Sequence, residues 1–467
     1  MSNDALSKNL WNEVLDFDLD QPLSEYNFSI RLAIENKWTE KFTERAILEY
    51  KKFMYLAATS DHLVSPSEII DKVWHQHLIF THSYSEFCKI LGKVIQHVPS
   101  LHSSSDFERL SNARKYTNEI YRKVFGVQPV DIWLNEDMLE SLDLPKAKYK
   151  IRSVVIVGIL SFIALSFPLY HLFKPFIIKI NNPYYVFNLF GIAISAFLFL
   201  EIHNRLVLKR IINKVISGSF LEQLTCQELI YLENLHLRSV IYISLSKLLK
   251  NNKIELDGRR FKIKINERVE SVEELTVYET LKGTEPGTFP DLIYKLEVKP
   301  YYNRTKNSMD AFKKYFIKSK AFAFIFYSNF CVLAGVEMIA FLRYLTGISR
   351  NKPVVIIFTA LVILSVLSIL FLYRLTNLVC TLTIPSYYAE NVLSDKDEQE
   401  SDDWQYFLLG TAIFPSMLTS LIWEERKGRN KWPNDGSGGS CGSACSSGGG
   451  SSCGSCSSCG GCGGGSD

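Results

Sequence analysis

Four long apolar runs constrain the fold of this 467-residue chain more than any other feature of its sequence. A bilayer core requires about 20 apolar residues in helical form, and uncharged runs of that length are rare in soluble domains. The runs cover residues 154–173, 184–200, 321–345 and 353–373. The sequence therefore predicts a mainly α, polytopic integral membrane protein. The lipid bilayer is the partner that these runs imply.

Lysine and arginine residues in the short flanks predict the orientation of these spans. They cluster before the first span, after the second and before the third, whereas each hairpin loop carries only two. The positive-inside rule then favours two transmembrane hairpins, residues 146–202 and 313–380, that enter the membrane from the cytoplasmic side. The N-terminal region and residues 203–312 are expected to be cytoplasmic, and residues 381–403 to form an acidic linker.

A fifth run, residues 404–423, decides on which side of the membrane the C-terminal tail lies. It is long enough to span, but it contains Pro415 and is followed by four basic residues within 426–431. Spanning would place these basic residues outside, against the charge rule. We therefore expect residues 404–431 to form an interfacial helix, with a fifth membrane helix as the alternative.

Residues 1–145 are expected to form a helical cytoplasmic domain. Within residues 66–99, several uncommon residues stand in a specific order, namely Asp71, Trp74, His75, His77, Thr81, Tyr84, Phe87, Cys88, Gly92, His97 and Pro99. Together with residues 48–57, this segment resembles the glycine-rich domain-containing protein family over about residues 25–130. That family has no established chemistry, so the resemblance implies a shared fold and no reaction.

The histidines of this segment raise the question of a metal site. On one helix, Asp71 and His75 share a face, whereas His77 lies about 200° away from His75 and cannot bind the same ion. Asp71 and His75, joined by His97 or Cys88, would be a suitable ligand set for zinc or iron. The structural alternative is an i,i+4 hydrogen-bonded pair of Asp71 and His75 that stabilises the helix.

The central region, residues 203–312, predicts a small α+β module. Thr225 and Glu228 form a capping box, a second helix ends near Asn251, and a two-stranded hairpin follows. Helix, helix and hairpin are the outline of a winged-helix domain. Its basic residues favour anionic membrane surfaces or a protein partner over nucleic acid. The reason is that no base-reading set of Arg, Asn or Gln side chains lines the second helix.

Residues 224–256 also resemble an uncharacterised bacterial multi-pass membrane-protein family with a cysteine- and glycine-rich C-terminal tail. The order of module, membrane helices and tail matches as well. In that family a glycine usually follows the first helix of the module, where this chain has Asn234 and Leu235. The resemblance implies a location in the bacterial cytoplasmic (inner) membrane.

Two charged residues interrupt the third apolar run. An intramembrane carboxylate is costly and is by default a functional candidate, so Glu337 is of interest, with Arg343 or a partner subunit as its possible counter-ion. The alternative is that Glu337 lies near the interface and reaches water. The four runs hold too few polar residues to line a transport pathway.

The tail, residues 432–467, consists almost entirely of Gly, Ser and Cys and is expected to be disordered. Its cysteines are Cys441, Cys445, Cys453, Cys456, Cys459 and Cys462. Three interpretations stay open: a loose metal-binding tail, a substrate of a modifying enzyme or of oxidation, and a flexible terminus. Disulfides are expected only if the tail lies outside the cytoplasm.

The chain carries no nucleophilic triad, Walker loop, dinucleotide fingerprint or zincin motif. We therefore expect a non-enzymatic membrane scaffold or binding protein that contacts other proteins through its cytoplasmic domains and carries a thiol-rich tail. The alternative is a metal-dependent enzyme with its site around Asp71, His75 and His97.

Overall fold

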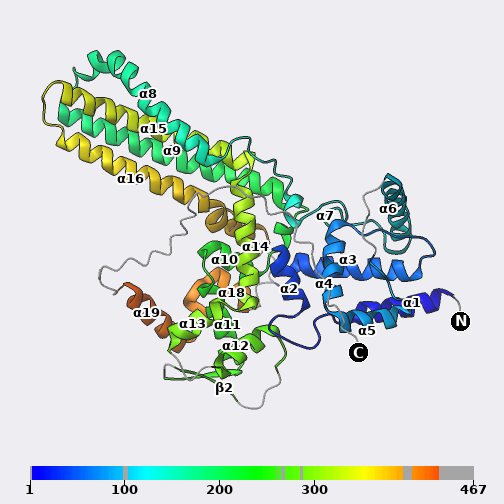
Figure 1. The fold of residues 1–467 in the computed structure, drawn as a ribbon. Helices are drawn as coiled ribbons and strands as arrows, with labels where there is room; N and C mark the ends of the chain where they lie inside the picture. Colours follow the sequence, from blue (N-terminus) through cyan, green and yellow to red (C-terminus); the bar gives the residue numbers. More distant parts are fainter. Residues whose placement is uncertain are drawn as a thin grey trace, which may run out of the picture. The chain divides into compact units, whose positions relative to one another are not determined.

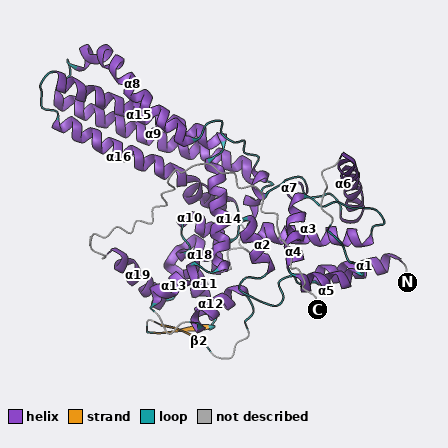
Figure 2. Cartoon of the chain, viewed as in Figure 1, coloured by secondary structure: helices purple, strands orange, loops and turns teal. Residues whose placement is uncertain are grey.

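The computed structural model describes residues 3–97, 104–258, 260–264, 269–283, 288–392 and 402–430. These residues are mainly helical, as the sequence predicts, and a single two-stranded sheet occurs among them (Figures 1 and 2). Contacts divide the chain into one compact unit of residues 1–422 and a second unit of residues 423–467. The six tail cysteines lie outside the described residues.

The N-terminal region is built around one amphipathic helix, α3. The helices here are α1 Asn3–Asp16, α2 Phe28–Asn36, α3 Glu40–Thr59, α4 Glu68–Ile79, α5 Thr81–Leu91, α6 Ser104–Phe125, α7 Val130–Trp133 and the 3-10 helix η1 Met138–Leu142. Phe42, Ala46, Tyr50 and Phe53 recur at helical spacing along α3, and all four are buried. Helices α1, α2, α4, α5 and α6 pack around α3, so this stripe forms the centre of the domain core.

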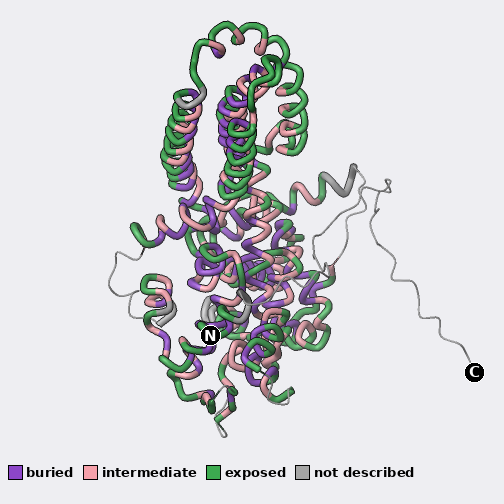
Figure 3. Tube along the Cα trace, turned by 90° about the vertical axis from the view of Figure 1, so that its left-hand side faces the viewer, coloured by how far each residue is buried: buried purple, intermediate pink, exposed green. Residues whose placement is uncertain are grey.

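Among the residues that the structure describes, four helices are long and apolar enough to cross a membrane, which confirms the four predicted spans by length and composition. They are α8 Ile151–Ile177, α9 Asn182–Ile216, α15 Lys320–Ser349 and α16 Val355–Leu378. Helix α15 packs against the other three. Many of their large apolar residues are exposed, and Figure 3 colours much of these helices as exposed, as expected for surfaces that contact lipid.

The central region contains the predicted helix, helix and hairpin. Its elements are the 3-10 helix η2 Phe220–Gln223, α10 Cys226–Asn234, α11 Arg238–Lys250, β1 Ile254–Asp257, β2 Arg260–Ile263, α12 Val272–Lys282, α13 Phe289–Glu297 and α14 Pro300–Ile317. The Thr225–Glu228 capping box is present at the start of α10. Strands β1 and β2 are antiparallel, with Ile254 opposite Ile263. Leu235 ends α10 with a φ of 57°, the left-handed conformation that a glycine would adopt without strain.

The N-terminal region and the central module pack into one compact unit. Buried residues of both belong to a single core cluster. At their junction the Arg304 guanidinium donates to the Glu40 carboxylate at 2.9 Å, and the Glu40 backbone N–H donates to Glu228 at 3.0 Å. Lys299 and Glu25 form a second ion pair at 2.8 Å. The two predicted cytoplasmic domains therefore share a packed interface.

The first part of the segment expected as an acidic linker, residues 381–391, is helical. After α16, a π-helical turn, Val379–Thr383, leads into α17, Ile384–Asn391. Ile384 and Tyr388 are buried, and the Tyr388 hydroxyl donates to the Leu221 carbonyl at 2.6 Å. Residues 381–392 are thus held against the central module, because apolar side chains precede the acidic ones in this segment. Residues 393–401 lie outside the described residues.

The fifth apolar run is divided into short elements. Helix α18, Asp402–Leu409, is followed by a 3-10 turn, Gly410–Ile413, and by α19, Ser416–Asn430. Gly410 has a φ of 63°, and Pro415 precedes α19, so the run is not one continuous helix. Helix α18 packs on α10 and α11, and Tyr406 and Leu418 are buried.

Candidate metal centre

Helix α4 presents Asp71 and His75 on one face. It begins after Ser67, whose side chain accepts the backbone N–H of Ile70 at 3.3 Å. The sequence suggests Ser65 for this capping role; instead, the Ser65 backbone N–H donates to the Thr117 hydroxyl on α6 at 2.9 Å. The cap therefore lies two residues later, and Pro66 stands outside the helix.

Asp71 lies between two histidines. Its Oδ2 is 3.3 Å from His75 Nε2, one helical turn away, and its Oδ1 is 2.9 Å from His97 Nε2. The His75 side chain is 58% exposed, Asp71 is 32% exposed and His97 is 19% exposed. The donor atoms of all three lie within 4.8 Å of one another. The structure thus brings together the three residues that the sequence singled out.

An aromatic network holds His97 in place. His97 follows α5, and its ring packs edge-on against Trp74 with the centroids 4.6 Å apart. The Trp74 indole N–H donates to the Tyr84 hydroxyl at 3.2 Å, and this hydroxyl donates to the carbonyl of Ile95, two residues before His97. The loop that carries His97 is therefore tied to the helix that carries Asp71 and His75. This role of Tyr84 could not be predicted from its place in the sequence.

The spacing of the donor atoms suits a single metal ion. Ligand atoms of a tetrahedral ion with bonds of about 2.1 Å lie about 3.4 Å apart, close to the two separations from Asp71. Two histidines and one carboxylate are also a ligand set of non-haem iron(II) and leave further positions open. The same spacing equally suits a hydrogen-bonded trio, in which Asp71 accepts from both imidazoles.

His77 and Cys88 are not part of this group. His77 is fully buried on the opposite face of α4, 2.8 Å from the Tyr50 hydroxyl and 3.1 Å from the Ser83 hydroxyl. Burial lowers the pKa of His77 to about 4, so it is neutral at physiological pH. Cys88 is buried as well. Among the described residues, the third member of the group with Asp71 and His75 is His97 and not Cys88.

A pocket of about 290 Å³ opens beside the trio. Asp71, Trp74 and His97 line one part of it, and Arg109 and Arg114 of α6 line another. A small molecule with a negative charge would meet both arginines and a metal ion held by the trio. Neither arginine could be predicted from the sequence, because both lie in a charged helix with no motif that connects it to α4.

Of the two charged residues in the third span, Arg343 is bonded to backbone carbonyls. The Arg343 guanidinium donates to the backbone carbonyls of Ile177 at 2.6 Å and Ile180 at 2.9 Å. Glu337 is not a member of any ion pair formed by the residues that the structure describes. Arg343 thus caps the carbonyl end of α8, and the pairing of Glu337 with Arg343 or with a partner subunit stays a prediction.

Comparison with known proteins yields one match. A family model described as UCP032817-like matches residues 23–142, about a quarter of the chain. This range contains Asp71, His75 and His97 together with helices α2 to α7. None of the curated proteins matches the chain, and no solved structure matches it.

Proposed function

We propose that this chain is a multi-pass membrane scaffold or binding protein whose N-terminal domain binds one divalent metal ion, zinc or iron, through Asp71, His75 and His97. The observation that carries the proposal is the position of the Asp71 carboxylate between the two imidazoles, 2.9 Å and 3.3 Å from their Nε2 atoms. A bound ion would join α4 to the loop after α5 and stabilise this surface for a partner.

Metal content of the purified full-length protein tests this proposal, measured with the six tail cysteines replaced by serine so that metal held by the tail is not counted. We expect about one equivalent of zinc or iron, lost on chelation and regained when either ion is added back. H75A and H97A should each abolish stoichiometric binding. H82A is the matched control, because His82 is 88% exposed and faces only Glu86. Equal metal content in H82A, H75A and H97A, or none in the wild type, would contradict the proposal.

The pocket beside the trio favours a second candidate, a metal-dependent enzyme acting on an anionic substrate. Arg109 and Arg114 would hold the anion, and the open metal positions would activate a water molecule or the substrate. Substitution of His75 separates the two functions. A scaffold should lose stability or partner binding, whereas an enzyme should keep its fold and lose turnover.

We place the N-terminal domain and the central module in the cytoplasm of a bacterial cell, beneath the cytoplasmic membrane. The lysines and arginines that flank the membrane helices support this orientation. The division of residues 404–423 into two short helices, with α18 packed on α10 and α11, supports a tail on the same side. Labelling of a single cysteine placed in the loop at residues 350–352 and of one in the tail, from outside intact cells, tests the placement: only the loop should react.

For the central module we propose a winged-helix-like unit that contacts a protein or the membrane surface. Several of its cations face carboxylates: Arg238 with Glu297 at 2.8 Å, Lys262 with Asp257 at 2.6 Å and Lys247 with Glu273 at 3.9 Å. Such pairing leaves less charge for phosphate contacts and argues against nucleic acid. Salt-sensitive DNA binding by the detergent-solubilised chain would contradict this proposal.

The tail is proposed to bind metal through its six cysteines or to be the substrate of a modifying enzyme. Intact mass combined with thiol counting, on protein taken from native membranes, separates these possibilities. Added metal mass that a chelator removes supports the first, and covalent adducts support the second. Six free, unmodified thiols would contradict both.

A further inference from the structure

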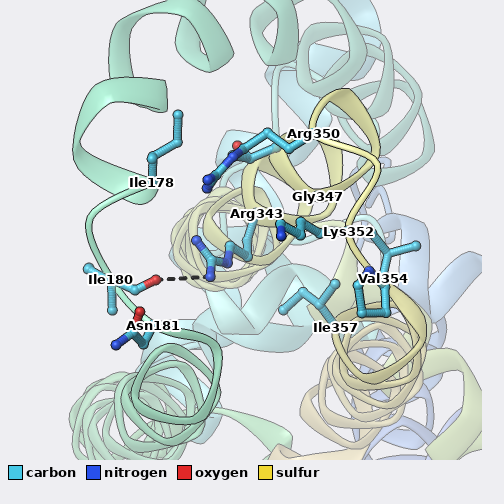
Figure 4. Close-up of a pocket in the computed structure, with 11 residues that line it drawn as sticks. Ile178, Ile180, Asn181, Arg343, Gly347, Arg350, Lys352, Val354 and Ile357 are labelled. Atoms are coloured by element: carbon cyan, nitrogen blue, oxygen red, sulfur yellow. Dashed lines mark hydrogen bonds between the residues drawn. The ribbon is translucent and has the colours of Figure 1, made fainter.

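The ends of the two membrane hairpins enclose a polar pocket of about 360 Å³. It lies where the turn between α8 and α9 meets the turn between α15 and α16 (Figure 4). Arg343, Arg350 and Lys352 line it together with the apolar side chains of Ile178 and Ile357. Three cations and an apolar wall thus meet in one site, which we call the tip pocket.

The tip pocket has an excess of positive charge. Residues 144–200 and 338–389 contain no Asp or Glu, so neither hairpin supplies a carboxylate near its turn. Arg350 and Lys352 form no ion pair with any residue that the structure describes. Unpaired cations grouped in this way attract an anion with several acceptor oxygens.

Arg343 has a structural role within the pocket. Its two terminal nitrogens are occupied by the carbonyls of Ile177 and Ile180, and its guanidinium lies over the Tyr185 ring, 4.8 Å from the centroid. Figure 4 shows its bond to Ile180 and the side chains of Arg350 and Lys352 around the same opening. Arg343 therefore joins the hairpins, whereas Arg350 and Lys352 are the two cations available to a ligand.

The other end of the helix bundle differs in this respect. There the Arg374 guanidinium forms a two-pronged pair with the Glu201 carboxylate at 2.8 and 2.9 Å, and Lys209 pairs with Glu390 at 2.6 Å. At that end Arg374 and Lys209 are thus paired with carboxylates of the chain, whereas Arg350 and Lys352 of the tip pocket pair with no carboxylate that the structure describes.

The length of the helices places this charge at the level of lipid headgroups. Helix α16 has 24 residues, which corresponds to about 36 Å at a rise of about 1.5 Å per residue. A bilayer core is about 30 Å thick, so the turn at residues 350–354 extends just beyond the hydrocarbon. Phosphate groups of lipids occupy that level, and the apolar wall of the pocket suits the first part of an acyl chain.

From this geometry we infer that the tip pocket binds the phosphate of an anionic phospholipid headgroup. Arg350 and Lys352 contact the phosphate oxygens, and Ile178 and Ile357 contact the glycerol and acyl region. The bound lipid would neutralise the charge between the two hairpin turns and stabilise their packing.

Full-length protein in nanodiscs tests the inference. In discs of phosphatidylcholine doped with phosphatidylglycerol, the wild type should retain one phosphatidylglycerol through delipidation in native mass spectrometry. Its thermal midpoint should also be higher than in discs of phosphatidylcholine alone. The double variant R350Q/K352Q should bind this lipid about 30-fold more weakly, given about a kilocalorie per basic residue.

Two further variants make the result decisive. R350K/K352R keeps both charges and should retain the lipid, which separates lost charge from lost folding. R210Q/K214Q removes two exposed cations from α9, at the end of the bundle opposite the tip, and should also retain it. Equal loss of the lipid in R210Q/K214Q and R350Q/K352Q would overturn the inference, since the effect would then be general surface charge.

A final arm separates the lipid from free phosphate. In phosphatidylcholine discs, inorganic phosphate at constant ionic strength should give no stabilisation relative to chloride. If it stabilises the wild type as much as phosphatidylglycerol does, and R350Q/K352Q loses this effect, the pocket takes a soluble anion and the lipid assignment is wrong.

Discussion

Asn204 of α9 and Asn329 of α15 exchange two amide hydrogen bonds, each 2.8 Å long. Both side chains are buried, with exposed fractions of 1% and 0%. Asn329 also donates to the Ile325 carbonyl one turn earlier at 2.7 Å. A reciprocal pair gives each amide nitrogen an acceptor and each amide oxygen a donor where water is excluded, so it fixes the register of these two helices.

Replacing one member of this pair should be worse than replacing both. N204L or N329L leaves a buried amide without its partner, and we expect a loss of about 1–2 kcal/mol in unfolding free energy. The double variant N204L/N329L should recover much of this loss, because no amide is then left unsatisfied. Unfolding of the four proteins in mild detergent gives the coupling energy, and strictly additive losses would contradict the pairing.

Close packing of α8 on α15 depends on Gly158. A methyl group placed on its Cα would lie 2.3 Å from a ring carbon of Phe330. We expect G158A to destabilise the protein by about 1–3 kcal/mol, since the ring must move and overpacking strains the contact. G191A on α9 is the control, because nothing lies within 4 Å of the added methyl there. F330A should rescue G158A; equal unfolding midpoints for G158A and G191A would show that the helices do not pack this way.

The buried carboxylate of Glu49 organises the N-terminal core. It accepts from the Tyr121 hydroxyl and the Trp133 indole, each at 2.8 Å, and pairs with Lys52 at 2.7 Å. We expect E49A to cost about 3–5 kcal/mol, because it leaves a half-buried ammonium group and two donors without their acceptor.

Glu44 provides the comparison on the same helix. It pairs with Lys41 at 2.9 Å, but both side chains are more than half exposed. E44A should therefore change the free energy of unfolding by less than about 1 kcal/mol. Denaturant titration of both variants checks the contrast, and losses of similar size would contradict the role of the Glu49 cluster.

Much of the fold could be predicted from periodicity. The spacing of Phe42, Ala46, Tyr50 and Phe53 predicts the central helix, and the length of the apolar runs predicts four long helices, because burial and membrane insertion both act on patterns visible in one segment. The capping box at Thr225 is equally local. For the candidate site, the i,i+4 relation of Asp71 and His75 follows from helix geometry alone.

Relationships between distant segments could not be predicted in this way. The approach of His97 to Asp71 depends on Tyr84 bonding to the Ile95 carbonyl, and the approach of Arg109 and Arg114 depends on how α6 packs. Residues 404–423 were misleading because hydropathy cannot distinguish a continuous helix from two short ones broken at Gly410 and Pro415. The cap at Ser67 could not be predicted because Ser65 has the same side chain and also precedes the helix. Only the structure shows that the Ser65 backbone N–H bonds to the Thr117 hydroxyl on α6.

The junction between the N-terminal region and the central module should respond to pH through Glu228. Its carboxylate accepts the backbone N–H groups of Glu40 at 3.0 Å and Thr225 at 2.9 Å, yet it is almost completely buried. Burial is the main cause that raises the pKa of Glu228 from 4.5 to about 7, and the backbone hydrogen bonds only partly oppose it. The folded protein therefore binds this proton more tightly than the unfolded chain.

The direction of the pH effect follows from this difference. The unfolding free energy contributed by Glu228 is greatest below the unfolded pKa of about 4.5 and falls as the pH rises towards 7. We expect E228Q, which is neutral throughout, to show a flatter pH profile than the wild type between about pH 5 and pH 7. D257N is the control, because Asp257 is exposed and its pair with Lys262 lowers its pKa, so that it titrates below this window. If the unfolding free energy of E228Q depends on pH as steeply as that of the wild type, Glu228 stays charged in the folded junction. The backbone N–H groups at the starts of α3 and α10 would then stabilise its charge.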